Sequence, residues 1–497
     1  MNIRRTPSVL IVGAGLVGLS TAIALREHGV DAHVVERRAG TSSQPKARRF
    51  NFRTMEVFRS FGIAGEVTEA ARGLADYQGM RAGRTLVEAE ALPAPPHVDF
   101  GELAAISPEQ SCLVAQDLLE PVLLRLARDR GATVDFDTEV VGLSQDPDGV
   151  TVSLHGGERR VSYVVASDGA HSTVRDLLGI ARAGAGEFDP AVTVYFDADL
   201  SDLVRGREFN LCQVETPQAP GGFASVDGLR RWLFFTGELL PVDASAERWA
   251  ALVREAIGRP DVDLHIRSVQ AWRPAMLVAE QFRSGRVFLA GDAAHVMPPF
   301  AAMGANTGIQ DAANLAWKLA LALRGEAGPA LLETYHQERH AAGWYAAEQS
   351  AAYTGGLREM GAPREGLAHP FALVAGYRYA EGALVDDGLG PQPMDRLSLT
   401  GRPGTRVPHA WLADGRSTLD VTGSGFGLLT GPGGQRWIEA ARSSGIAAAV
   451  ADGVVDKGAL LVRPDGIVAW ATADASPTSE TVLREVLDTV CGRPQQA

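Results

Sequence analysis

The segment "SVLIVGAGLVG", Ser8 to Gly18, predicts the first strand and turn of a nucleotide-binding fold. Ser8 to Val12 has the apolar character of a buried strand. Apolar residues at helical spacing then predict a helix from Leu16 to His28 that Gly29 ends, and "DAHVVE", Asp31 to Glu36, predicts a second strand. Strand, helix and strand within about thirty residues form a βαβ unit with a right-handed crossover.

The glycines of this segment follow the G-x-G-x-x-G spacing. Gly13 permits a tight turn, Gly15 lets backbone N–H groups approach a pyrophosphate, and Gly18 lets helix and strand pack closely. The start of the helix favours an anion by up to ~1 kcal/mol. Glu36 ends the second strand, where an acid can accept ribose hydroxyl protons. The motif predicts an ADP-containing dinucleotide and leaves NAD and FAD open.

Composition narrows the class of protein. A chain of 497 residues predicts about three domains. With 45% hydrophobic and 22% charged residues it is typical of globular proteins, and a net charge of −13 without a basic block argues against a nucleic-acid partner. The scattered Cys112, Cys212 and Cys491 favour the cytoplasm and give no metal or disulfide pattern. We expect no signal peptide and no membrane span.

The pass along the chain predicts an α/β protein. A nucleotide-binding domain is expected at residues 1–188 and 271–397, the second part with long helices. Residues 189–270 alternate β-branched and aromatic residues between Pro-Gly-Gly and Asp-Gly turns, which predicts an inserted antiparallel sheet. Residues 398–497 contain turns and strands of a separate α/β domain.

Two further segments bear on the cofactor. They are "DGAHSTVR", Asp168 to Arg175, and "GDAAHVMPPFAAMGANTGIQDAANLAWKL", Gly291 to Leu319. Asp292 follows an apolar strand, where its carboxylate could accept hydrogen bonds from the hydroxyls of a ribityl chain, which FAD has and NAD lacks. Either aspartate alone would favour a turn or a helix cap over a cofactor contact. Together with the glycine motif, they favour FAD.

These three segments resemble the group A flavoprotein monooxygenases, the para-hydroxybenzoate hydroxylase superfamily, over Thr6 to Gly343. The third segment is most similar to hydroxylases of aromatic polyketides in bacterial antibiotic pathways. The resemblance implies a Rossmann-like FAD-binding domain, an inserted β-sheet substrate domain and a thioredoxin-like C-terminal domain without redox cysteines. Cys491 is the lone cysteine of that last part, so we expect no disulfide chemistry there.

The resemblance also implies where FAD is held. The glycine loop is expected at the pyrophosphate, Glu36 at the adenosine ribose, and Asp292 at the ribityl and pyrophosphate region. Lys46 stands where relatives usually have Arg, so it keeps the charge and loses the planar fork. The expected cofactor-binding residues are Gly13, Ala14, Gly15, Leu16, Val17, Gly18, Glu36, Arg37, Lys46, Gln116, Asp168, Asp292, Pro299, Gly304, Ala305 and Asn306.

The chemistry implied by the resemblance is carried by the cofactor. Flavin reduced by NADPH or NADH reacts with O2 to a C4a-hydroperoxide, which oxygenates an electron-rich ring. Backbone N–H groups of Gly304 to Thr307 are expected to face the negative charge of reduced flavin, and Pro298, Pro299 and Asn306 to shape the peroxide site. We assign no catalytic side chain and no metal, and expect His295 to be structural.

The expected substrate is a neutral or phenolic aromatic polyketide-type compound under the inserted sheet. Phe300, Ala301 and Ala302 stand where many relatives have Thr-Gly-Gly after the prolines, and Phe300 either narrows the pocket or serves packing. Other expected partners are O2 and NAD(P)H, and the expected state is a monomer or homodimer. Among the aromatics of this part of the chain, the substrate candidates are Phe223, Trp232, Phe234 and Phe300.

Three alternatives stay open at this point, and a fourth is disfavoured. The same scaffold could perform Baeyer–Villiger oxygen insertion, or could inactivate an antibiotic rather than help to make one. A flavin halogenase is disfavoured because no WxWxIP sequence occurs. The non-enzymatic alternative is a flavin-binding interaction protein.

Overall fold

A computed structural model describes residues 8–93, 100–353, 365–474 and 479–494. Its central element is a six-stranded sheet in the order β19-β20-β11-β1-β2-β7, parallel except for β19. Its middle strands are buried on both faces, which explains their continuous apolar runs. The strands are β1 (Ser8–Val12), β2 (Asp31–Val35), β7 (Thr133–Asp135), β11 (Tyr163–Ala166), β19 (Arg283–Ser284) and β20 (Val287–Leu289).

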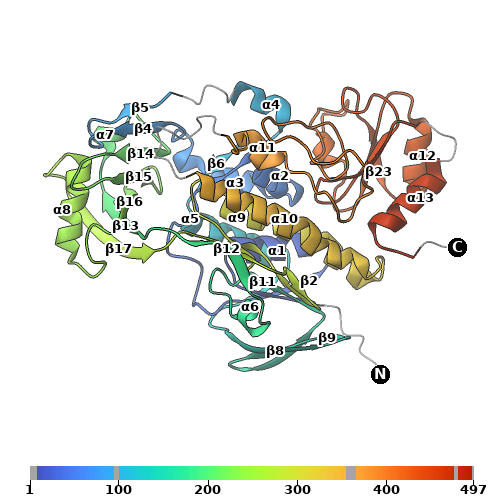
Figure 1. Cartoon of the computed structure of the whole chain (residues 1–497), viewed down its shortest axis with the longest axis horizontal. Helices are drawn as coiled ribbons and strands as arrows, with labels where there is room; N and C mark the ends of the chain where they lie inside the picture. The colour runs from blue at the N-terminus through green and yellow to red at the C-terminus, as the bar shows by residue number, and fades with distance from the viewer. Residues whose placement is uncertain (1–7, 94–99, 354–364, 475–478, 495–497) are drawn as a thin grey trace.

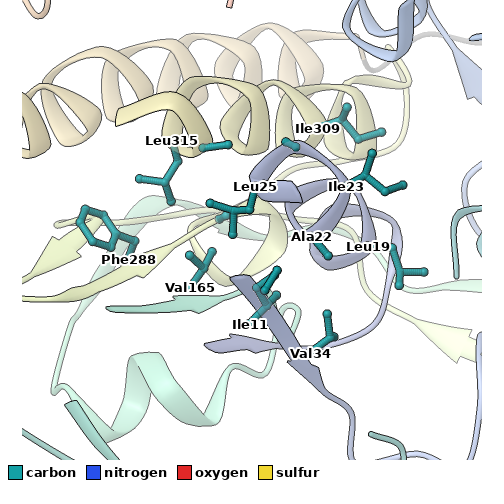
Figure 2. Close-up of a cluster of buried hydrophobic side chains, with 14 of the residues drawn as sticks. Ile11, Leu19, Ala22, Ile23, Leu25, Val34, Val165, Phe288, Ile309 and Leu315 are labelled. Carbon is teal, nitrogen blue, oxygen red and sulfur yellow. The ribbon is translucent and has the colours of Figure 1, made fainter. Parts of the chain in front are cut away.

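Helix α1 (Leu16–Glu27) connects β1 to β2, so the predicted strand–helix–strand unit is confirmed. It packs against α5 (Gln116–Asp129) and α9 (Met303–Arg324), and α9 packs in turn against α10 (Ala330–Ala352). Figure 2 shows apolar side chains of α1 lying between those of the sheet and those of α9. The strands β8 (Val140–Asp146), β9 (Gly149–Leu154) and β10 (Gly157–Val161) form a separate three-stranded sheet.

The inserted sheet is seven-stranded, in the order β17-β13-β16-β15-β14-β4-β5. Two of its strands, β4 and β5, come from residues 80–91, so the predicted boundary at residue 189 leaves them out. Helix α8 (Ala246–Ile257) packs on this sheet, and the two form the end of the molecule remote from the C-terminal domain (Figure 1). The strands are β4 (Met80–Gly83), β5 (Glu90–Ala91), β13 (Ala191–Ala198), β14 (Leu211–Val214), β15 (Gly221–Ser225), β16 (Arg231–Gly237) and β17 (Leu264–Trp272).

The C-terminal domain has the strand order β23-β22-β24-β25. β22 and β23 are parallel and joined by α12, whereas β24 and β25 form an antiparallel hairpin followed by α13. The predicted α/β character of this part of the chain is confirmed, and its likeness to thioredoxin stays a prediction. Its elements are β22 (Gly427–Thr430), α12 (Gln435–Ser443), β23 (Ala447–Val450), β24 (Ala459–Val462), β25 (Val468–Thr472) and α13 (Ser479–Val490).

Shorter elements join these parts. No helix within the described ranges is long and apolar enough to cross a membrane. The shorter elements are β3 (Arg49–Phe50), α2 (Phe52–Ser60), α3 (Ala64–Ala70), α4 (Leu103–Ile106), β6 (Cys112–Leu113), α6 (Thr173–Leu177), β12 (Arg182–Glu187), α7 (Ser201–Val204), β18 (Ala275–Ala279), β21 (His295–Val296) and α11 (Pro370–Ala375).

Candidate functional site

Three loops that are far apart in the sequence meet at the carboxyl edge of the parallel sheet. Gly13 has φ 105°, and a side chain there would overlap the backbone carbonyl of Ser167. Val17, in the first turn of α1, lies against Gly291 and Gly308, where an added Cβ would come within 2.8 and 2.5 Å of its Cγ2. The glycines therefore let the loops after β1, β11 and β20 pack closely, at the edge where α/β sheets bind ligands. We call this place the cofactor site, bordered by Gly15, Glu36, Asp292 and Gly304.

Two glycines of the glycine loop have different roles, since one is required for packing and the other leaves space for a ligand. A Cβ on Gly18 would overlap the Gly13 carbonyl oxygen, so this position is dictated by the fold. A Cβ on Gly15 would come no closer than 3.6 Å to any described atom, the nearest being Oε1 of Glu120. Gly15 is the N-cap of α1 and, within the described part of the chain, no side chain caps it. Free N–H groups and open space at a helix N-terminus suit a pyrophosphate.

Glu36 is fixed beside this loop by backbone donors. Ala14 N–H donates to its Oε2 and Arg38 N–H to its Oε1, both at 2.9 Å. Each carboxylate oxygen accepts more than one hydrogen bond, so both stay able to accept from ribose hydroxyls. The neighbouring Arg37 is exposed.

Gln116 begins α5 and joins two segments near the glycine loop. Its Oε1 accepts from Ala47 N at 3.3 Å, and its Nε2 donates to Oε1 of Glu120 at 2.6 Å. Glu120 also accepts from Ser42 N at 2.6 Å, and burial raises the pKa of its carboxyl. Sequence analysis missed Glu120, although an acid one turn after Gln116 was a usable signal.

Asp292 lies in a short turn directly after β20, as expected for a strand-end carboxylate. Its side chain is open to solvent, yet burial raises the pKa of its carboxyl, while the charges of His295 and Lys46 lower it. Access to solvent combined with close surrounding protein is what a carboxylate lining a recess would have. Lys46 is exposed near this carboxylate.

The two carboxylate oxygens of Asp168 differ in a way that suits both roles left open by the sequence, a helix cap and a cofactor contact. Its Oδ2 accepts from Val174 N at 3.1 Å, which caps the short helix α6. Its Oδ1 is buried and has no hydrogen-bond partner in the described structure, and burial raises the pKa of this carboxyl. One oxygen thus stabilises the fold and the other is left without a partner.

Asn306 positions its surroundings through four side-chain hydrogen bonds. Its Oδ1 accepts from Asn51 N at 3.0 Å and from Thr54 Oγ1 at 2.6 Å. Its Nδ2 donates to the carbonyls of Arg49, at 2.9 Å, and Ala302, at 2.6 Å. These bonds occupy the amide, so the side chain holds β3 and α2 against the start of α9. That Asn306 shapes the site of the flavin stays a prediction.

The N-terminus of α9 is uncapped and points its free N–H groups outward from the helix. Its N-cap residue Ala302 has φ 54°, a strained value for a residue other than glycine, and is held by a hydrogen bond from its N to Pro299 O at 3.0 Å. No side chain of the described chain caps this end. Gly304 and Ala305 lie in the first turn, whose N–H groups have no intrahelical acceptor and carry the positive end of the helix dipole.

The loop before α9 bears on whether Phe300 narrows the pocket or serves packing. Pro298 is buried, whereas Pro299 is exposed and the residue Phe300 is 44% exposed. Phe300 therefore does not serve core packing.

A buried charged network supports the loop from behind. Asp311 accepts from Gly291 N at 2.9 Å and contacts His295 Nε2 at 2.7 Å, while Arg339 Nε donates to its other oxygen at 2.7 Å. Although burial raises the pKa of Asp311, the charges of His295 and Arg339 lower it further, and the net shift is downward. The structural role expected for His295 agrees with this placement. Asp311 and Arg339 were missed by sequence analysis, although an acid inside an apolar helix was a signal for Asp311.

Three of the four substrate candidates lie on the outer side of the inserted sheet. Phe223, Trp232 and Phe234 are at most 1% exposed and share a core with α8. On the other face, Tyr195, Leu233 and Phe235 pack toward Ala115 and Leu118, where α5 begins. Side chains alternate along a strand, so a shift of one residue moves an aromatic from one face to the other. The sequence pattern identified the aromatic strands and gave no means of choosing the face.

Comparisons with known proteins agree with this architecture. Residues 6–350 match the family described as FAD binding domain, and residues 400–494 match aromatic-ring hydroxylase, C-terminal. The tetracenomycin B2 monooxygenase-dioxygenase of Streptomyces olivaceus is 39% identical, with 98% of each chain covered. The aklavinone 12-hydroxylase RdmE of Streptomyces purpurascens is 38% identical, with 97% of this chain and 98% of the relative covered.

A solved structure shares the whole fold. The ternary complex of aklavinone-11 hydroxylase with FAD and aklavinone superposes with a TM-score of 0.89 at 35% identity, covering 99% of this chain and 100% of that one. The chain belongs to the FAD-binding aromatic-ring hydroxylase family. It is an FAD-dependent monooxygenase, and its cofactor is FAD.

Proposed function

We propose that this monooxygenase hydroxylates a polycyclic aromatic compound of the polyketide type, with NADPH or NADH as the reductant, in the biosynthesis of a secondary metabolite. The observation that carries the proposal is likeness over the full chain to enzymes named for such compounds. Tetracenomycin and aklavinone oxygenases at 37–39% identity include both the FAD-binding part and the C-terminal domain.

The residues of the cofactor site fit FAD. The open space at Gly15 and the uncapped start of α1 suit the pyrophosphate, and Glu36 suits the adenosine ribose. Asp292 would accept hydrogen bonds from the ribityl hydroxyls, with Lys46 beside it for the pyrophosphate charge. FAD, when bound, supplies the reaction with oxygen and the oxygen transfer that no side chain could provide.

The protein's own contribution is positioning and electrostatics. N–H groups of Gly304 and Ala305 would stabilise negative charge on the ring system at the start of α9. Pro299, with no N–H and a fixed φ, would keep the loop in front of the ring stiff. The inner face of the inserted sheet, with Tyr195 and Phe235, would cover a flat ligand.

The test is a panel of aromatic polyketide aglycones given to the FAD-loaded enzyme. A substrate should stimulate NADPH or NADH oxidation and gain one oxygen atom in the product by mass spectrometry. Stimulated oxidation that leaves the aglycone unaltered, or no stimulation by any member, would contradict the proposal.

The identity of the inserted oxygens separates further outcomes. Two relatives are named monooxygenase-dioxygenases, so products made under ¹⁸O2 should be examined for labels beyond the first. A lactone or a cleaved ring in the product would indicate Baeyer–Villiger insertion instead of hydroxylation.

A further inference from the structure

Arg49 lies where the cofactor site, α9 and the inserted sheet meet. β3, which begins at Arg49, pairs with β6. Asn306 at the start of α9 donates to the Arg49 carbonyl at 2.9 Å, and the preceding Arg48 donates from Nη1 to the carbonyl of Asn210, next to β14, at 3.2 Å. Through the Arg49 carbonyl this segment is attached to the helix start proposed to face the flavin ring, and through the Arg48 side chain it is attached to the sheet proposed to cover the substrate.

Arg48 and Arg49 are adjacent cations without an acidic partner among the described residues. Arg48 is 8% exposed, and its Nε and Nη2 are buried with no hydrogen-bond partner in the described structure. Arg49 is half-buried, and no ion pair or side-chain hydrogen bond is found for it within the described ranges. Protein surrounds the Arg49 guanidinium closely enough that burial lowers its pKa. Solvent still reaches the side chain, because the residue is only half-buried. The titratable neighbours are Arg48 and Cys112, with Glu109 beyond the thiol.

The lack of an acidic partner sets Arg48 and Arg49 apart from other enclosed arginines of the molecule. The buried Arg339, Arg406 and Arg463 each form an ion pair with a carboxylate. An enclosed guanidinium without such a partner is costly, and a ligand anion would remove the cost. Of the two unpaired arginines, Arg48 has its free nitrogens sealed off, which leaves Arg49 as the one that a ligand can reach.

Building on the proposed function, we propose that Arg49 binds an anionic oxygen substituent of the aromatic substrate and favours its ionised form. A guanidinium matches carboxylate and phenolate oxygens through its planar set of donors. A phenolate also donates electron density to its ring, which helps the ring to accept an oxygen atom. Arg49 would therefore determine which substrates bind and would activate those that carry an acidic hydroxyl.

The experiment uses the FAD-loaded enzyme and three anthraquinones that differ in one substituent. 2-Hydroxyanthraquinone changes colour when it ionises, anthraquinone-2-carboxylate is charged at neutral pH, and 2-methoxyanthraquinone cannot ionise. Binding and ionisation are followed by difference absorbance against ligand-free holoenzyme. The variants are Arg49→Met, Arg49→Lys to keep the charge, and Arg230→Met as an exposed arginine of the inserted domain for control.

In the wild-type enzyme the pKa of bound 2-hydroxyanthraquinone should be about one unit or more below its value in water. Arg49→Met should remove this shift and weaken the anionic ligand about tenfold or more, while the affinity for the methoxy compound stays the same. Arg49→Lys should restore most of the shift, and Arg230→Met should change nothing. If the carboxylate alone responds to Arg49→Met, the group recognised is a carboxylate and not a phenolate.

Two results would overturn the inference. One is an unshifted pKa of the bound hydroxyl compound in the wild type with no response of the carboxylate to Arg49→Met; the other is equal losses for all three ligands in Arg49→Met. Either result leaves the proposed function standing if aglycones still stimulate NADPH or NADH oxidation. If no aromatic ligand binds or stimulates the yellow holoenzyme, the proposed function itself fails.

Discussion

The junction of the C-terminal domain and the cofactor site handle buried charge in opposite ways. At the junction, both Oε atoms of Glu338 accept from Arg463, each at 2.8 Å, and Lys318 lies 2.9 Å from Oε2; all three side chains are fully buried. Glu56 on α2 likewise pairs with Arg406, which comes from the start of the C-terminal domain. Every charge named here is met by an opposite charge of the protein.

At the cofactor site the enclosed charges lack such partners. Arg49 has no acid in the described chain, Oδ1 of Asp168 has no donor there, and the start of α9 carries no side-chain cap from a described residue. Burial without pairing is costly, so proteins retain it where a ligand completes the set. The comparison teaches that pairing, more than burial, distinguishes the charges that hold this fold from the solvent-accessible charges that we propose to serve its ligands.

The largest effect should come from breaking the paired region. Glu338→Gln removes the carboxylate that pairs with the buried Lys318 and one of the two acids that pair with Arg463, whose Nε still donates to Asp465 Oδ1 at 3.0 Å. The free energy of unfolding should therefore fall by about 3–5 kcal/mol. Glu333→Gln is the matched control on the same helix, since its pair with Arg283 involves a 64% exposed side chain and is worth about 1 kcal/mol at most. Urea unfolding followed by tryptophan fluorescence measures both. Similar losses for the two variants would contradict the role given to pairing.

Two adjacent phenylalanines test the two faces of the inserted sheet. Phe234→Ala opens a cavity in the core under α8 and should cost about 3–5 kcal/mol of stability. Phe235→Ala, on the inner face, should cost less stability and should instead raise the KM for an aglycone. Thermal unfolding and steady-state NADPH oxidation separate the two effects. The assignment of the faces fails if Phe234→Ala folds normally and alters substrate selectivity more than Phe235→Ala does.

Asp292→Asn tests the unpaired region. The amide loses the charge that ribityl hydroxyls would bond to, so FAD affinity should fall about tenfold, the value of one charged hydrogen bond. The stability of the FAD-free protein should not fall, because burial raises the pKa of Asp292 and disfavours its charged form. Fluorescence titration with FAD and unfolding of the apoprotein provide the two measurements. A loss of apoprotein stability equal to that in Glu338→Gln would remove the distinction between the regions.

The smallest expected effect is a difference in pH dependence. The pKa of Glu338 is lowered to about 2, since Arg463 and Lys318 outweigh its burial, so its contribution is complete above pH 4.5 and is lost as pH falls toward 2. Burial raises the pKa of Glu120, so its effect has the opposite sign, and stability declines as pH rises through its raised pKa. Relative to wild type, Glu338→Gln should flatten the acid limb of the stability curve. Glu120→Gln should leave that limb in place and remove the decline with rising pH.

Much of the cofactor-binding fold could be predicted because it depends on local pattern. The glycine spacing, the apolar strands and the helical periodicity of α1 act over about thirty residues, and the structure has these elements nearly at the predicted bounds. Glycines 13, 15 and 18 were identified for reasons that the structure supports at Gly13 and Gly18. The face of the inserted sheet that packs against α8 was not predictable, because alternation fixes which residues share a face and leaves open which face meets α8.

The sequence by itself determined the class of the protein, and it predicted the order of its domains and the segments expected to approach FAD, since each rests on motifs whose spacing has a local physical cause. Only the tertiary structure decided which charges are paired. Glu338 and Arg463 are 125 residues apart, and Glu56 and Arg406 are 350 apart, so nothing local to any of these residues indicates its partner. Pairing depends on which buried groups the packed chain brings within hydrogen-bonding distance, and that distance is a property of the fold.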